Sequence, residues 1–278
     1  MFKILLSLSL ISALLPGWDI FKNEKELPVV SITKIYLDPE EIEPSGIEYD
    51  LTTKRIVVVS DEGKIVSVDS ETFQPEIFYP LKNMDLEGIS FHPKFSNLIF
   101  AVEEGKDNIL VFNKKGVLLS KCNVNRKFRG KKVLSKKGNG LESITFFKED
   151  GDYSYFFIAN QSDDFSGKDR SAILLVKTLT SNIANNILGD ASIVSYYPQN
   201  IEDISGMTYH NNYLFVISDT NNYLFIFNDK LEMLDSFLIP GEDQEGIVFD
   251  GHTMYIAQDS GGLLKVVIDK DRFPYLGN

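Results

Sequence analysis

Short alternating runs of apolar and polar residues recur along most of the chain. One pattern, an acidic or small residue followed by a brief apolar–polar alternation, is present in five copies: EPSGIEYD at 43–50, DLEGISFH at 85–92, NGLESITF at 139–146, DISGMTYH at 203–210 and DQEGIVFD at 243–250. Two further runs rich in β-branched and aromatic residues follow each copy, and a third follows four of the five. Such runs, bounded by Gly, Asn, Asp and Lys, predict β-strands. No segment of useful length has the 3.6-residue period of a helix, so the sequence predicts an all-β fold.

The repeat predicts a five-bladed β-propeller in which every blade is a four-stranded antiparallel sheet. Four strands that recur every 40 residues or so are typical of propeller blades. The fifth copy lacks its fourth strand, whereas the run PVVSITKIYL at 28–37 precedes the first copy and has no blade of its own. Pairing of 28–37 with the last blade, at 262–269, would close the ring and cover both free edges. A six-bladed ring would need another copy, and the sequence contains none.

The first residues have the layout of a secretory signal peptide. Lys3 precedes a mostly apolar run that Pro16 and Gly17 interrupt. The run is shorter than the roughly 20 apolar residues that span a bilayer. We therefore expect residues 1–22 to be a signal peptide or a short membrane anchor, with a buried N-terminal strand as a third alternative. Residues 23–278 are expected to form a single propeller domain that is periplasmic, secreted or held at the membrane by the N-terminus.

Composition narrows the choice of partners. The chain has 28 Lys and Arg against 40 Asp and Glu, a net charge of −12, which disfavours nucleic acid and anionic membranes as general partners. The single cysteine, Cys122, cannot form an internal disulfide, so core packing, alone or with a metal, must hold an exported protein together. We expect a monomer that binds a small molecule or an envelope protein, with at most a loose association with the inner membrane.

Acidic residues occupy matching places in the repeats. In an up-and-down blade the start of the first strand and the end of the second lie at the same rim of the channel. The starts provide Glu87, Glu142 and Glu245, and the ends provide Asp61, Glu103, Asn160, Asp219 and Asp259. Clustered carboxylates repel one another unless a cation compensates, and carboxylate and amide oxygens are ligands that Ca²⁺ prefers. The sequence therefore predicts a Ca²⁺ site at this mouth; the alternative is that these residues cap strand ends and link blades by hydrogen bonds to the backbone.

A basic segment joins the second and third copies on the same rim. Residues 121–137 carry eight Lys and Arg, among which Arg126, Lys127, Arg129 and Lys131 are candidate ligand-binding residues. They are interpreted either as a cationic flap over the acidic mouth, suited to an anionic ligand, or as a solvated loop. The three histidines fall after the first strands and therefore at the opposite rim, so a Ser–His pair is not supported.

The run at 202–268 resembles the SdiA-regulated, YjiK-like propeller proteins of bacteria. It has the S-G element of that family, the strand end VISD, the E-G-I copy and a following Y-I-A strand, and the copies at 85–92 and 139–146 fit with Ser143 in place of the usual second glycine. The resemblance covers roughly residues 28–268. It implies an exported or membrane-anchored propeller and no particular activity.

Two functional classes remain open at this stage. The first is a non-enzymatic envelope protein that binds a ligand or partner at a calcium-stabilised channel mouth. The second is a cation-dependent phosphoesterase or lactonase, because the acidic channel is also similar to the channels of metal-dependent propeller hydrolases, in which a cation polarises the substrate and activates water. Those rings usually have six blades, and outside 121–137 the sequence offers no Lys/Arg cradle for a phosphate.

Overall fold

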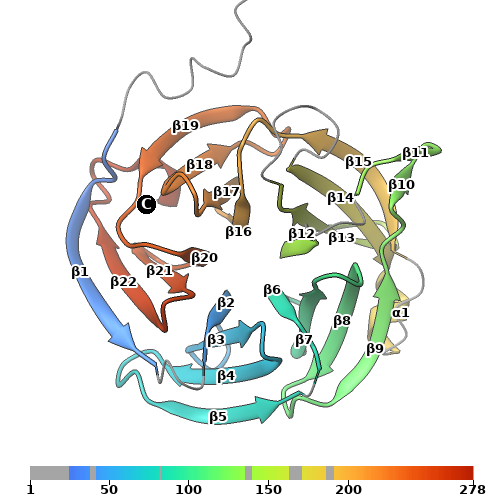
Figure 1. Cartoon of the computed structure of the whole chain (residues 1–278), viewed down its shortest axis with the longest axis horizontal. Helices are drawn as coiled ribbons and strands as arrows, with labels where there is room; N and C mark the ends of the chain where they lie inside the picture. Colours follow the sequence, from blue (N-terminus) through green and yellow to red (C-terminus); the bar gives the residue numbers. More distant parts are fainter. Residues whose placement is uncertain are drawn as a thin grey trace, which may run out of the picture.

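Five four-stranded antiparallel sheets surround a central axis in the computed structural model, which describes residues 25–37, 42–81, 83–134, 140–162, 171–185 and 191–277 (Figure 1). This arrangement confirms the predicted five-bladed β-propeller. From the axis outward, blade 1 consists of β2 (Pro44–Asp50), β3 (Arg55–Ser60), β4 (Lys64–Asp69) and β5 (Pro75–Pro80); blade 2 of β6 (Leu86–His92), β7 (Phe95–Glu103), β8 (Asn108–Asn113) and β9 (Leu118–Asn123); and blade 3 of β12 (Leu141–Asp150), β13 (Tyr153–Asn160), β14 (Ala172–Leu179) and β15 (Ser192–Pro198). Blade 4 consists of β16 (Ile204–His210), β17 (Tyr213–Ser218), β18 (Tyr223–Phe227) and β19 (Met233–Leu238), and blade 5 of β20 (Gln244–Asp250), β21 (Thr253–Gln258), β22 (Gly262–Ile268) and β1 (Val29–Tyr36).

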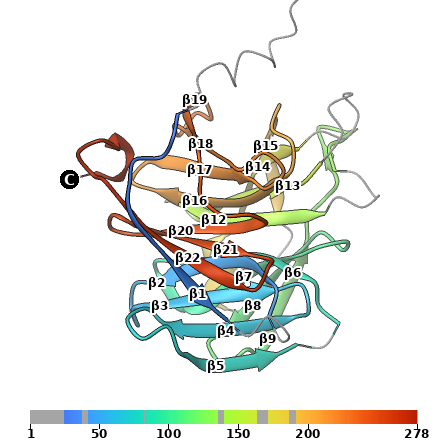
Figure 2. The same ribbon diagram turned by 60° about the vertical axis from the view of Figure 1, so that its left-hand side comes forward.

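The N-terminal strand closes the ring. β1 pairs antiparallel with β22, from Val29 opposite Ile268 to Tyr36 opposite Gly262, and the two strands run side by side in both views (Figures 1 and 2). Ile35 and Leu37 are buried against blades 5 and 1. The predicted pairing of 28–37 with 262–269 is therefore confirmed.

Both ends of the described chain also fasten blade 4, which the sequence did not predict. Before β1 begins, the Leu27 N–H donates to the Leu238 carbonyl and the Leu238 N–H donates to the Lys25 carbonyl. After β22 the chain turns back through the short helix η1 (Pro274–Leu276), where the Tyr275 hydroxyl donates to Asp235 at 3.1 Å. The two ends thus hold blades 4 and 5 together.

The core lies between the blades. The buried apolar side chains form five clusters, and each cluster fills the space between two neighbouring blades. Phe156 and Ile158 of β13, for example, face blade 2, whereas Phe157 and Ala159 of the same strand face blade 4. Because both faces of each middle strand are covered, these strands are apolar runs rather than alternating ones.

Glycines near the start of the inner strands permit a close approach of neighbouring blades. A Cβ atom on Gly46 would lie 2.2 Å from the Glu87 carbonyl oxygen, and one on Gly88 would lie 2.4 Å from the Ser143 Cα. At the equivalent place in blade 3, the Ser143 hydroxyl accepts the Met207 N–H at 2.8 Å. The inner strands therefore form a narrow waist, which separates the two mouths of the channel.

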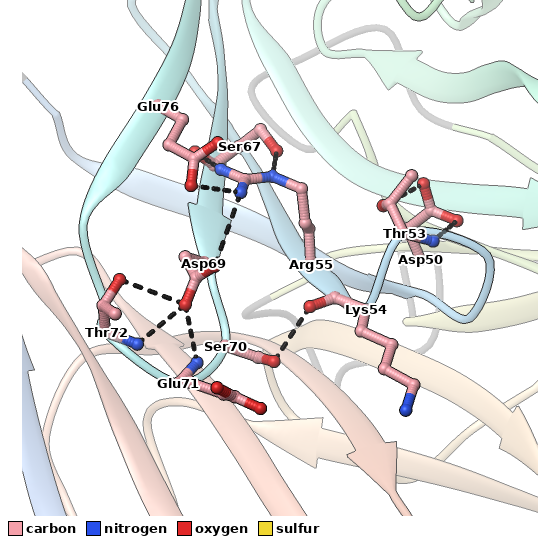
Figure 3. A network of polar contacts seen from close by, with 10 residues as sticks. All are labelled: Asp50, Thr53, Lys54, Arg55, Ser67, Asp69, Ser70, Glu71, Thr72 and Glu76. Carbon is pink, nitrogen blue, oxygen red and sulfur yellow. Dashed lines mark hydrogen bonds and ion pairs between the residues drawn. The ribbon is translucent and has the colours of Figure 1, made fainter.

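Polar contacts link the outer strands of blade 1 near the mouth opposite the acids. Arg55 of β3 donates to the hydroxyl of Ser67 at 2.5 Å and to its carbonyl at 2.9 Å, and its guanidinium lies 2.9 Å from Glu76 on β5 (Figure 3). Asp69 accepts two backbone N–H groups of the following turn. Arg55 thereby connects three strands of the blade.

The longer connections between strands, after β9, β13 and β14, contain little regular structure among the described residues. A short helix α1 (Thr180–Ala184) follows β14, and a two-stranded hairpin, β10 (Lys127–Phe128) with β11 (Lys131–Lys132), follows β9. Residues 163–170 of the loop after β13 and all of the expected signal or anchor segment at 1–22 lie outside the described residues. Among the helices that are described, none has the length and apolar character needed to cross a membrane.

Candidate functional site

Three rings of equivalent residues build the acidic mouth. The first ring stands at the start of each inner strand and holds Ser45, Glu87, Glu142, Ser205 and Glu245. The second precedes the inner strands and holds Glu43, Asp85, Gly140, Asp203 and Asp243. The third follows the second strand of each blade, opposite the second ring, and holds Asp61, Glu104, Gln161, Asp219 and Asp259. Three, four and four members of these rings, respectively, are acids.

The three glutamates of the first ring come together at this mouth. Glu142 and Glu87 are only 6% and 9% exposed. Burial, followed by the repulsion of Glu142, Asp85 and other acids, raises the pKa of Glu87 to about 10. Burial, followed by repulsion from Glu104 and Glu245, raises the pKa of Glu142 well above its ordinary value. The site is thus short of positive charge.

Glu245 and Asp61 also have raised pKa values. Burial, with repulsion from Asp219 and Asp203, raises the pKa of Glu245 to about 8. Partial burial, with repulsion from Glu62 and Glu43, raises the pKa of Asp61 to about 6. A shift of one pKa unit corresponds to about 1.4 kcal/mol between the two protonation states. Ionising these groups together in an ion-free mouth would therefore cost several kcal/mol.

Glu142 has an orphaned oxygen within this ring. Its Oε1 atom is buried and, among the described residues, has no hydrogen-bond partner. A buried carboxylate oxygen without a donor costs folding free energy, so such an atom requires an explanation. A proton shared with a neighbouring carboxylate or a bound cation would supply the missing partner.

Two groups of acids have the spacing of a metal site. One oxygen from each of Asp85, Glu87 and Glu104 lies within 4.8 Å of the others, and the same holds for Glu43, Asp61 and Glu62 at the exposed edge. Ca²⁺ accepts six to eight oxygen ligands at about 2.3–2.6 Å, mostly from carboxylates, carbonyls and water. The donor set at this mouth therefore fits Ca²⁺ better than it fits zinc, which prefers nitrogen and sulfur.

The structure places Glu103 and Asn160 differently from the other predicted ligands. Both lie one residue before the third ring, at the position that Ser60, Ser218 and Gln258 hold in the other three blades. Glu103 accepts hydrogen bonds from Lys106 at 2.5 Å and from Asn108 at 2.7 Å, so its carboxylate is already paired. The Asn160 amide donates to the Gln161 carbonyl at 3.1 Å.

Successive strand residues point to opposite faces, so a shift of one position moves a side chain to the other face. The sequence predicted Glu103 and Asn160 for this place. In the structure, Glu104 and Gln161 occupy it in the third ring. Asp61, Asp219 and Asp259 lie in that ring, and Asp219 accepts the Gln244 N–H at 2.8 Å.

The basic hairpin extends away from the mouth. β10 contacts β15, the outer strand of blade 3, at the perimeter of the ring (Figure 1). Lys127, Arg129 and Lys131 are exposed there. Arg126 forms an ion pair with Asp107 in the turn between β7 and β8. The structure thus describes an outlying basic hairpin rather than a flap over the acids.

His92, which lies beside Ser154, is not arranged as a general base. At the opposite mouth, His92 Nδ1 accepts the Lys94 N–H at 3.1 Å, while Nε2 lies 3.0 Å from the Ser154 hydroxyl. With Nδ1 as an acceptor, Nε2 carries the proton and donates it to Ser154. Burial lowers the His92 pKa to about 4, which keeps the ring neutral. This pair therefore links two strands rather than activating a nucleophile.

Comparisons with known proteins identify the fold and no family. No protein-family model matches the chain, and no curated protein is significantly similar to it in sequence. The glutaminyl cyclase of Myxococcus xanthus is similar in structure, with a TM-score of 0.59 and 8% identity over 88% of this chain and 97% of that one. Virginiamycin B lyase from Staphylococcus aureus has a TM-score of 0.49 and 12% identity, over 86% of this chain and 99% of that chain. The β-propeller domain of Cps50 (Swd1) from Myceliophteria thermophila has a TM-score of 0.48 and 7% identity, over 86% of this chain and all of that domain. At these identities the similarity concerns the fold alone.

Proposed function

We propose that the protein is an exported propeller that binds a ligand or partner at its acidic mouth through a bound Ca²⁺ ion. The observation that carries the proposal is the buried, unpartnered Oε1 of Glu142, which lies in a ring of acids whose pKa values are all raised. A divalent cation would give this oxygen a partner and would offset two of the three negative charges of Glu87, Glu142 and Glu245. The ligand or partner would then complete the coordination of the ion from the open side of the mouth.

The proposed location agrees with the proposed ion. Residues 1–22 have the layout of an export signal or anchor, and the repeats resemble an exported propeller family. Calcium sites of extracellular modules work with dissociation constants of about 10⁻⁴–10⁻³ M, and we expect this site to bind in that range. The motifs at 202–268, 85–92 and 139–146 support the further proposal that the chain belongs to the SdiA-regulated family.

Binding without catalysis is favoured over hydrolysis at this mouth. A phosphoesterase needs further cations that face the transferred group, but three basic residues described at this rim are engaged with acids, and the basic hairpin lies at the perimeter. Lys106 pairs with Glu103, Arg126 pairs with Asp107, and Lys64 lies 3.9 Å from Glu62. A screen of phosphoester and lactone substrates with calcium present tests the alternative, since turnover abolished by chelation would favour the hydrolase.

Glu142→Gln tests the calcium site. Saturating Ca²⁺ at about 100 times its dissociation constant adds about 2.7 kcal/mol, which corresponds to roughly 5–10 °C in melting temperature for a domain of this size. We expect the chelator-treated wild-type protein to show that shift on addition of Ca²⁺ and Glu142→Gln to show less than half of it. Glu71→Gln is the control, because Glu71 is exposed in the β4–β5 turn of blade 1 and not at this mouth.

Two outcomes would contradict this site. One is a wild-type melting temperature that does not respond to Ca²⁺, and the other is a full response in Glu142→Gln. Since the substitution removes a buried acid from a repulsive ring, we expect the variant to be at least as stable as the wild-type protein in the presence of chelator. We therefore expect Glu142→Gln to fold, so that its response to Ca²⁺ can be compared directly with that of the wild-type protein.

A further inference from the structure

The second mouth of the channel contains a cavity of about 320 Å³. It lies beyond the glycine waist, at the ends of the inner strands away from the acidic rings, and residues of all five inner strands line it. Cavities that bind small molecules start at about 300 Å³. The cavity therefore has the size of a site for a compact ligand of its own.

One aromatic side chain from each blade lines this cavity. The five hold the same place in the repeat and are Tyr49, Phe91, Phe146, Tyr209 and Phe249. Phe91, Phe146 and Tyr209 are partly exposed, whereas Tyr49 and Phe249 are buried in the clusters between blades. Aromatic side chains arranged around a cavity favour apolar ligands, and their faces attract cations.

The residue before each of these aromatic residues also lines the cavity. These five residues, which we call the floor, are Glu48, Ser90, Thr145, Thr208 and Val248. Ser90 and Thr145 accept backbone N–H groups of the next blade, from Phe146 at 2.9 Å and from Tyr209 at 3.0 Å. In blade 5 this place is taken by Val248, which has no acceptor to offer to blade 1.

Glu48 compensates for the missing acceptor in blade 5. Its Oε1 accepts the N–H of Tyr49 at 2.9 Å, and its carboxylate also accepts the N–H of Phe91 in the next blade. It is the one acid among the five floor positions, which also hold Ser90, Thr145, Thr208 and Val248. The floor therefore has a fixed carboxylate.

Nothing described around the floor neutralises Glu48. The nearby Lys114 is already paired with Asp50 and lies over the Phe91 ring, 5.4 Å from its centroid. Asp50 also accepts the Thr53 hydroxyl at 2.7 Å (Figure 3). It accepts the N–H of Thr52 at 3.0 Å as well. Burial raises the Glu48 pKa to about 7, although the N–H groups of Tyr49 and Phe91 oppose that shift. A cation that entered the cavity would stabilise the ionised carboxylate.

We propose that the second mouth binds a small organic ammonium ion, with the charge on Glu48 and the apolar body against Phe91, Phe146 and Tyr209. The fixed carboxylate provides a charged acceptor, the hydroxyls of the floor provide neutral ones, and the aromatic rings exclude water from the apolar part. A metal ion is a poorer occupant, because Glu48 is the only carboxylate of the floor. This proposal does not rest on the calcium site.

Titration with 2-phenylethylamine and its neutral analogue 2-phenylethanol tests the proposal. Both titrations are followed calorimetrically and by saturation-transfer NMR, with chelator present so that the result is independent of bound calcium. We expect the amine to bind in the millimolar range or tighter and the alcohol to bind at least tenfold more weakly. Glu48→Gln should weaken amine binding at least tenfold, and Phe91→Leu should weaken it severalfold. Glu71→Gln, on the same rim but outside the cavity, should bind like the wild-type protein.

The same experiment can overturn the proposal. Equal binding of amine and alcohol, undiminished amine binding by Glu48→Gln, or no binding of the amine at 10 mM would each contradict it. Loss of amine binding in Glu142→Gln but not in Glu48→Gln would place the amine in the acidic mouth and would also contradict it. Phe91→Leu removes no hydrogen bond and serves if Glu48→Gln does not fold.

Discussion

Deletion of residues 28–37 is expected to make the protein aggregate. The deletion removes β1 and leaves the whole length of β22, from Gly262 to Ile268, as an open edge. It also removes the buried Ile35 and Leu37 from the cluster between blades 5 and 1. Unpaired edges of this length template intermolecular pairing. Size-exclusion chromatography and a thermal melt of the deletion variant measure the effect.

Substitution of Val30, Ile32 and Tyr36 by threonine is the matched control for this deletion. These three side chains point outward and are 66%, 50% and 76% exposed, so the substitutions keep the backbone pairing and lose little buried surface. We expect this variant to remain monomeric with a melting temperature close to that of the wild-type protein. Addition of a synthetic peptide of residues 26–37 to the freshly refolded deletion variant should restore the monomer-sized species. A deletion variant that is monomeric and melts normally would contradict the closure of the ring by β1.

In the presence of chelator, the free energy of unfolding is expected to fall as pH rises from 6.5 to 8.5. Glu87 and Glu245 have folded-state pKa values of about 10 and about 8, above the ordinary value of 4.5. In this window the unfolded chain has already released these protons, whereas the folded protein still holds them, so stability is lost with rising pH. The loss from these two groups should be about 4 to 5 kcal/mol, measured by urea unfolding. His92 does not interfere, because burial lowers its pKa to about 4, and burial also lowers the pKa of His210.

Calcium and Glu142→Gln should both reduce this dependence on pH. Bound Ca²⁺ favours the ionised carboxylates, so the ion should stabilise the protein more at pH 8.5 than at pH 6.5. Removal of the Glu142 charge relieves the repulsion on its neighbours and should flatten the curve without calcium, whereas Glu71→Gln should follow the wild-type curve. Stability that stays constant or increases over this range in chelator would contradict the assignment of a repulsive acidic ring.

The repeat made the ring and its closure predictable from sequence, because equivalent residues in a propeller occupy equivalent places whatever the connecting loops do. The positions of Glu87, Glu142 and Glu245 at one mouth followed from that symmetry. The symmetry did not decide between Glu103 and Glu104, because these two adjacent acids both lie at the end of β7. Only the pairing of β7 with β6 shows which of the two faces the mouth.

Two other features were missed for different reasons. The C-terminal segment that packs on blade 4 has no counterpart in the repeat, so nothing in its sequence indicated where it lies. The aromatic residues of the second mouth did carry a signal, since all five copies have Tyr or Phe at the same place. That periodicity is also expected of a core position, and the structure shows both: Tyr49 and Phe249 are buried between blades, and all five residues line the cavity.

The position of a bound ion tests the central claim most directly. Crystals grown with millimolar Ca²⁺ and measured at a long wavelength would reveal calcium by its anomalous scattering. We predict one peak at the acidic mouth, with the Glu142 carboxylate and at least one of Glu87 and Glu245 about 2.3–2.6 Å from the ion. An ordered Glu142 with no peak beside it, its carboxyl group hydrogen-bonded to a neighbouring glutamate, would contradict the account.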